Sequence, residues 1–109
     1  MSRTLDEIKV KILSGATESK EIDTSYLAIL GLFVPTIDNS TLTFKVSSCS
    51  ANFVNIKDKA GATISFTVGT GGIAISSEDL AFLAAYRFIK IVSSEPQTAD
   101  RTFTWCLKE

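Results

Sequence analysis

Histidine is absent from the 109 residues of this chain. Its absence removes the usual general base near neutral pH, the usual zinc and copper ligand, and every Ser-His or Cys-His nucleophile. The chain also has no excess of positive charge, because eleven Lys and Arg residues are balanced by twelve Asp and Glu residues, and no block of like charge occurs. A basic surface for nucleic acid is therefore not expected. We expect a protein that is not an enzyme and uses neither a metal nor a cofactor.

Cysteine is limited to Cys49 and Cys106, too few for a disulfide framework or a Cys-x-x-Cys metal site. A single bridge would need neighbouring strands, and two unlinked thiols in a reducing compartment are the alternative that we favour. Long apolar runs are missing as well. The longest, residues 26–34, has about half of the roughly 20 residues that a membrane helix needs. Charged residues within 6–11 interrupt the start of the chain, so neither a signal peptide nor a membrane partner is expected.

Hydrophobic residues make up 45% of the chain and charged residues 21%, as in an ordinary globular protein. This length and composition predict one domain over residues 1–109, with residues 1–7 as a candidate flexible arm. Several segments alternate apolar and polar residues with a period of two, the pattern of half-buried strands. We expect strands at residues 8–13, 26–34, 41–47, 53–58, 62–68, 73–75, 86–92 and 102–107. Residues 14–23 are either an edge strand or a plain connection.

Two of these segments carry more specific expectations. Residues 26–34 are apolar on both faces, which predicts a central strand covered from both sides, with Gly31 at a bulge or close approach. Residues 41–47 alternate, which predicts Leu42, Phe44 and Val46 inside and Thr43, Lys45 and Ser47 outside.

Turn and helix signals complete the prediction. The segment Asp58–Gly61 predicts the tight turn of a hairpin, and the Ser76–Asp79 spacing of a capping box predicts a short helix near residues 77–84. About eight strands and one short helix favour an all-β fold, a jelly-roll-like antiparallel β-sandwich.

For each candidate motif, a structural role is favoured over a catalytic or ligand-binding role. The run Gly69-Thr70-Gly71-Gly72 joins two strands, so it predicts a turn and not a phosphate loop. Nothing in the sequence indicates that two of the loop carboxylates, such as Asp58, Asp79 and Asp100, form a catalytic pair. The sequence also has no calcium-binding loop pattern. Trp105 alternates with its apolar neighbours, which favours a core position over a sugar-stacking platform.

Tyr86 and Phe88 share one face of their strand with Lys90. That face is a candidate contact surface, and packing by the 77–84 helix is the alternative.

Three segments together resemble a family of small proteins encoded in tailed bacteriophages and prophages. They are LAILGLFVP (27–35) running into LTFKVSS (42–48), the hairpin FVNIKDKAGATISF (53–66), and AAYRFIKIVSS (84–94) followed by ADRTFTWCL (99–107). The resemblance covers about residues 8–108. The same order is similar to a discoidin or galactose-binding-like jelly roll, although residues 47–53 lack the Asp-Gly of that family's loop.

The resemblance implies a structural protein of the bacteriophage virion, made in the host cytoplasm: a capsid decoration or cement protein that contacts capsid or tail proteins and forms a homo-oligomer. The alternative is a glycan-binding module of a tail or fibre that attaches to the host. Docking is expected through residues 1–7 and the loops at 36–41, 48–52 and 93–100. The candidate contact residues are Asp38, Asn39, Asn52, Tyr86, Phe88 and Gln97.

Overall fold

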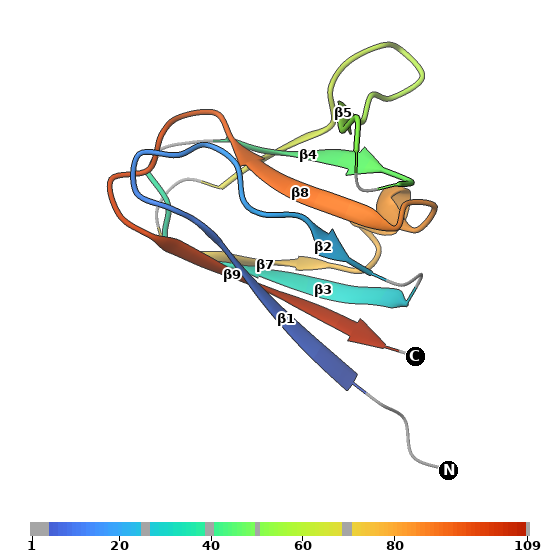
Figure 1. Ribbon diagram of the computed structural model, residues 1–109, viewed down its shortest axis with the longest axis horizontal. Coiled ribbons are helices and arrows are strands. Elements are labelled where there is room, and N and C mark those ends of the chain that lie inside the picture. Colours follow the sequence, from blue (N-terminus) through green and yellow to red (C-terminus); the bar gives the residue numbers. More distant parts are fainter. Residues whose placement is uncertain (1–4, 25–26, 39–40, 50, 69–70, 109) are drawn as a thin grey trace.

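The computed structural model describes residues 5–24, 27–38, 41–49, 51–68 and 71–108, and within these ranges the chain forms two stacked antiparallel β-sheets (Figure 1). The first sheet contains, in spatial order, β1 (Leu5–Ile12), β9 (Arg101–Lys108), β3 (Ala28–Val34) and β7 (Ile73–Ser76). The second contains β2 (Ile22–Asp23), β8 (Phe88–Ser93) and β4 (Thr41–Ser47), with both β5 (Val54–Asn55) and β6 (Ser65–Thr67) paired to β4.

The chain crosses between the sheets at almost every connection. The exceptions are the connections from β4 to β5 and from β5 to β6, which stay within the second sheet. The expected all-β antiparallel sandwich is confirmed, and the segment 14–23 contributes the short edge strand β2.

The core lies between the sheets and is filled by every second residue of the longer strands. In β4, Leu42, Phe44 and Val46 are buried. In β9, Phe103, Trp105 and Leu107 are fully buried, so Trp105 is a core residue as predicted. The remaining core side chains come mainly from β1, β3 and β8: Val10, Ile12, Leu32, Val34, Ile89 and Ile91.

An aromatic cluster joins the two sheets at the centre of this core. The ring of Phe44 in the second sheet lies 5.9 Å from that of Trp105 in the first, centroid to centroid, and 5.8 Å from that of Phe66. Phe82 closes the cluster, with its ring 6.1 Å from Phe44 and 6.2 Å from Phe66. Aromatic pairs at these distances add to the stabilisation gained by burial alone.

Strand β3 differs from its prediction. It is central in its sheet, but only one face is covered, since Leu30 is 41% and Phe33 56% exposed. The prediction that both faces are buried was therefore wrong, because no further layer packs on the outer side of the first sheet within the described residues. The expected irregularity at Gly31 is confirmed: the register shifts there, and a Cβ atom would lie 3.2 Å from the Ile75 carbonyl oxygen.

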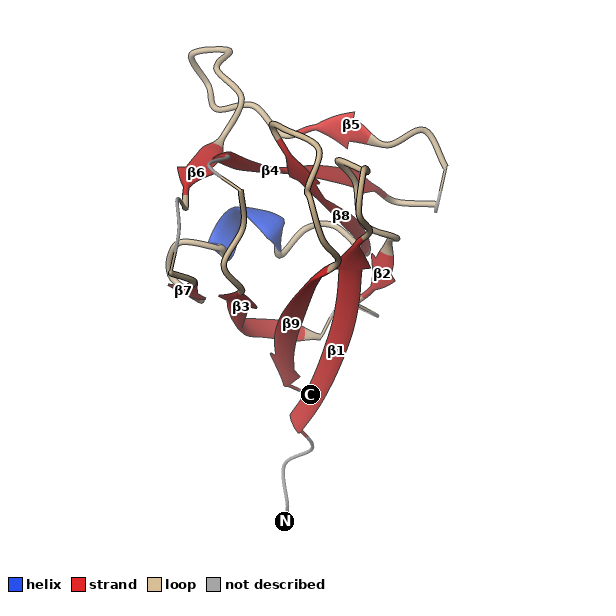
Figure 2. Ribbon diagram, turned by 90° about the vertical axis from the view of Figure 1, so that its left-hand side faces the viewer, coloured by secondary structure: helices blue, strands red, loops and turns tan. Residues whose placement is uncertain are grey.

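The predicted helix is much shorter than expected. Only Ala81–Leu83 are helical, in a 3-10 turn that no side-chain capping hydrogen bond begins. Residues 77–80 form turns instead, with the Leu80 N–H donating to the Ser76 and Ser77 carbonyls. The turn lies between the sheets (Figure 2) and directs Leu83 and the Phe82 ring into the core. It therefore packs inside the sandwich.

The predicted hairpin is present only at its tip. The Asp58 carboxylate accepts hydrogen bonds from the Ala60 and Ala62 N–H groups, and Gly61 takes the positive φ of 88° that the turn requires. Beyond the bridge between Lys57 and Thr63, the two strands separate and both pair with β4.

The start of the chain is more ordered than predicted. Strand β1 begins at Leu5, so residues 5–7 belong to the sheet and not to a flexible arm, and residues 1–4 lie outside the described part of the chain. Both cysteines are free thiols, as favoured above. No helix in the described residues is long and apolar enough to cross a membrane.

We predict that Phe44→Ala lowers the free energy of unfolding by about 3–5 kcal/mol, because it leaves a cavity where the two sheets meet. Urea denaturation followed by the fluorescence of Trp105, the chain's only tryptophan, measures this change. Phe33→Ala is the matched control, since that ring is 56% exposed and should cost far less. Equal losses in the two variants would contradict the assignment of the core.

Candidate functional site

Two of the predicted docking loops are joined by a polar network around Asp38. The Asp38 N–H donates to Gln97 Oε1 at 2.9 Å, and the Thr98 N–H donates to Asp38 Oδ2 at 2.6 Å. Arg101 donates to Asp38 Oδ1 at 2.9 Å. Gln97 is only 2% exposed, so it ties the loops together and is not a contact residue. Asn39 lies outside the described residues.

The same network holds Asp38 in its charged form. The hydrogen bond from the Thr98 backbone N–H, with a smaller contribution from the Arg101 guanidinium, lowers the pKa of the Asp38 carboxyl. Stabilisation of this kind is complete above the ordinary aspartate pKa, near 3.9, and is lost as the pH falls through the lowered value.

Asn52 lies in the loop after β4, exposed and with a positive φ of 58°. A side chain that was predicted to be exposed, Ser47, organises this loop. Its hydroxyl is buried, donates to the Ala51 carbonyl, and accepts from the N–H groups of Cys49 and Ala51. The prediction for Ser47 was wrong because these local hydrogen bonds replace water.

Tyr86 and Phe88 do not form a shared open face. Tyr86 packs against the core, and the Arg87 guanidinium lies over the Phe88 ring, 5.3 Å from its centroid. Arg87 is itself held by two hydrogen bonds to the Asp23 carboxylate, at 2.8 and 2.9 Å. The rings therefore offer little flat surface for stacking a ligand.

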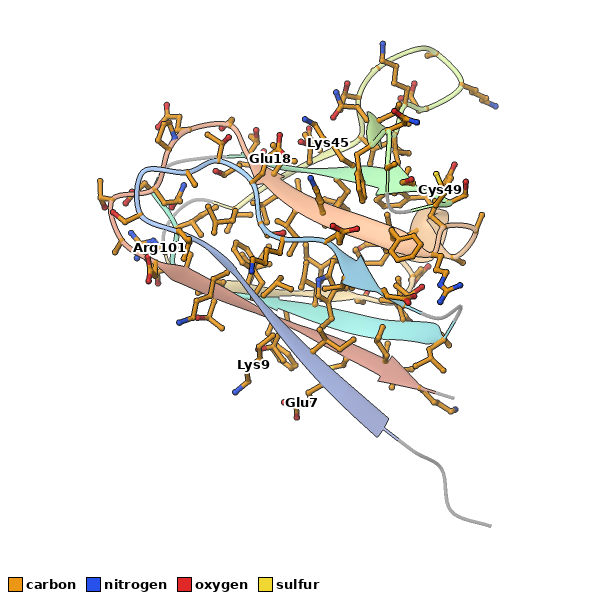
Figure 3. All side chains as sticks on the ribbon, viewed as in Figure 1. Glu7, Lys9, Glu18, Lys45, Cys49 and Arg101 are labelled. Atoms are coloured by element: carbon orange, nitrogen blue, oxygen red, sulfur yellow. The ribbon has the colours of Figure 1, made fainter. Side chains whose placement is uncertain are left out.

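The outer side of the second sheet carries a charged cluster that the sequence did not indicate (Figure 3). Glu18 accepts a hydrogen bond from Lys45 at 2.7 Å and lies 3.8 Å from the Lys90 ammonium. Lys90 also lies over the Phe53 ring, 4.5 Å from its centroid. The Lys45 hydrogen bond lowers the pKa of Glu18. One carboxylate thus pairs with two ammonium groups, and the cluster keeps a net positive charge.

By contrast, the outer side of the first sheet is apolar over β3 and β7. We name the β3–β7 patch for the residues around a shallow hollow of about 330 Å³ on this side. Gly31 opposes both Cys106 and Ser76, and Phe33 opposes Ala74, so the missing side chain of Gly31 leaves the hollow beside the Phe33 ring. The patch consists of Leu30, Gly31, Phe33, Ala74, Ser76 and Cys106.

The sequence indicated the apolar residues of the β3–β7 patch, but it did not indicate that they face solvent. The alternation of β9 and the apolar run of β3 are visible in the sequence, whereas the absence of a covering layer depends on the whole topology. Within the described residues, no group of three or more His, Cys, Asp or Glu side chains could hold a metal ion.

Comparisons with known proteins show a shared fold. No protein-family model matches the chain, and no curated protein matches it in sequence. Among solved structures, the crystal structure of the SPBc2 prophage-derived protein YomS is similar, with a TM-score of 0.59 at 11% sequence identity. The similarity covers 100% of this chain and 98% of that chain. It spans both sheets, so the whole sandwich is an architecture that both chains share.

We predict that Asp38→Asn destabilises the protein at pH 7, and progressively less as the pH falls from about 4 toward 2, because the wild-type carboxylate loses its stabilising contacts when it is protonated. Urea denaturation of both proteins across this pH range gives the difference. Glu78→Gln, which makes the same change in net charge on an exposed turn, is the control. A difference between wild type and Asp38→Asn that stays constant with pH would show that ionised Asp38 does not hold the loops.

Proposed function

We propose that this protein is a non-enzymatic structural component of a bacteriophage virion that decorates the assembled capsid surface. Two findings support a phage role: the full-length fold similarity to a prophage-derived protein, and the sequence resemblance of three segments to phage and prophage proteins. The observation that carries the proposal is the exposed β3–β7 patch. Its apolar side chains lie outside the buried core, so they are available for contact with another protein.

The β3–β7 patch has the features of a protein contact. A large aromatic ring with 56% of its surface exposed is unusual on a small monomer, and aromatic residues are enriched where proteins meet. The ring borders a hollow that a side chain of the partner could fill. On a capsid, many copies bound to a symmetric lattice need only modest area at each contact, because attachment at several points raises the overall affinity.

The glycan-binding alternative has less support. It needs an open aromatic platform, and the rings of Tyr86 and Phe88 are occupied by the core and by Arg87. Binding of the purified protein to a glycan array would favour a role in host attachment over capsid decoration.

We predict that Phe33→Glu abolishes binding to the capsid, because it places a charge in the centre of the apolar contact. The experiment adds purified protein to capsids of its own phage that lack this protein, and measures the bound fraction by sedimentation. Val54→Glu is the matched control: Val54 is 61% exposed on the second sheet, away from the patch, and its replacement should leave binding unchanged.

Two results would contradict the proposal. Either wild-type protein fails to co-sediment with the capsids, or Phe33→Glu binds as well as Val54→Glu. Circular dichroism of both variants establishes that they are folded before binding is measured.

A further inference from the structure

A groove runs between the edges of the two sheets, where β1 and β2 lie along the same side of the sandwich (Figure 1). Its volume is about 600 Å³. Its apolar lining consists of Ile8, Val10, Ile22 and Leu13, of which Leu13 is 54% exposed. The charged residues Lys9, Lys11, Lys20, Glu21 and Asp23 also border it. This apolar surface lies far from the β3–β7 patch, since β1 and β7 form opposite edges of the first sheet.

The groove is bordered by strand edges that are open to another strand. Within the described residues, β1 pairs only with β9, and β2 pairs only with β8. An edge strand presents unpaired N–H and C=O groups, which can accept a further strand. Of the two, β1 is the longer, at eight residues against two.

The charges of β1 are arranged so that the strand complements itself. Glu7, Lys9 and Lys11 are exposed on its outer side, and none of them forms an ion pair with another described residue. Figure 3 shows Glu7 and Lys9 close together on the side that points away from the second sheet. Lysine on an edge strand discourages pairing with most strands, but Glu7 makes one antiparallel pairing favourable.

We propose that β1 pairs antiparallel with β1 of a second copy of this chain, about a two-fold axis at Ile8. In this register Glu7 of each copy opposes Lys9 of the other, and the two Ile8 side chains meet on the inner face. An axis at Glu7 would oppose two glutamates. An axis at Lys9 would pair Glu7 with Lys11 of the other copy but would oppose the two Lys9 side chains. Of these three registers, the axis at Ile8 forms two opposite-charge pairs without a like-charge pair, so charge favours it. An axis between two residues would pair side chains from opposite faces of the sheet.

The proposed pairing involves the groove as well as the exposed charges of β1. It joins the two four-stranded sheets of the copies into one continuous sheet. The two Ile8 residues then face each other at the open side of both grooves, and Val10 of each copy opposes Asp6 of the other. Such a contact is isologous, with the same surface used by both copies. It leaves the β3–β7 patch exposed, so this inference stands independently of the proposed capsid role.

A charge-swap experiment tests the proposal. Sedimentation velocity of the full chain over a range of concentrations measures the dimer dissociation constant for wild type, Glu7→Lys, Lys9→Glu and the double variant. Each single reversal should weaken the dimer on the order of tenfold or more, because two opposite-charge pairs become like-charge pairs. The double variant should restore wild-type affinity, because both pairs are formed again with their signs exchanged.

Lys57→Glu provides the matched control, since it reverses an exposed charge beside the Asp58 turn and should not change dimerisation. All variants change solvent-exposed side chains, and their thermal unfolding is compared with that of wild type. A wild-type chain that stays monomeric at every concentration overturns the proposal. So does a dimer that neither single reversal weakens, or one that the double variant fails to restore.

Discussion

The whole structure depends on the contact between the two sheets, where Phe44 of β4 packs against Trp105 of β9. Alternation along the strands sends every second side chain to this interface, and the interface takes up most of the aromatic residues. Because these rings lie inside, what the chain offers to other molecules is carried by the outer faces, the strand edges and the loops. The proposed functions therefore depend on contact surfaces and not on a reactive cavity.

The two outer faces are suited to different tasks. On the second sheet, Glu18 forms ion pairs with Lys45 and Lys90, and Arg87 lies over the Phe88 ring, so these charged and aromatic groups already have partners within the chain. On the first sheet, Phe33 and the hollow at Gly31 have no such cover among the described residues. The edge at β1 is different again, with an apolar inner side and charges that complement a second copy. The surface proposed to contact the capsid and the edge proposed to pair with a second copy are therefore separate.

Much of the fold could be predicted from the sequence, because alternation in β1, β4 and β9 directly reports which side chains face the core. The sequence could not reveal whether a second layer covers the other side, which is why the apolar run of β3 was wrongly expected to be buried on both faces. Local hydrogen bonds also override the pattern, as the buried hydroxyl of Ser47 shows. The candidate site was harder still. Asp38 and Gln97 are 59 residues apart in the chain, and only the folded topology makes one of them a buried anchor for the other.

Native-state hydrogen exchange shows whether the two sheets form one cooperative unit that is held by their shared core. If they do, the slowest amides of β4 and β8 and those of β3 and β9 exchange with the same opening free energy, equal to that of global unfolding. If one sheet opens at a clearly lower free energy while the other stays protected, the sheets do not depend on each other, and the account fails.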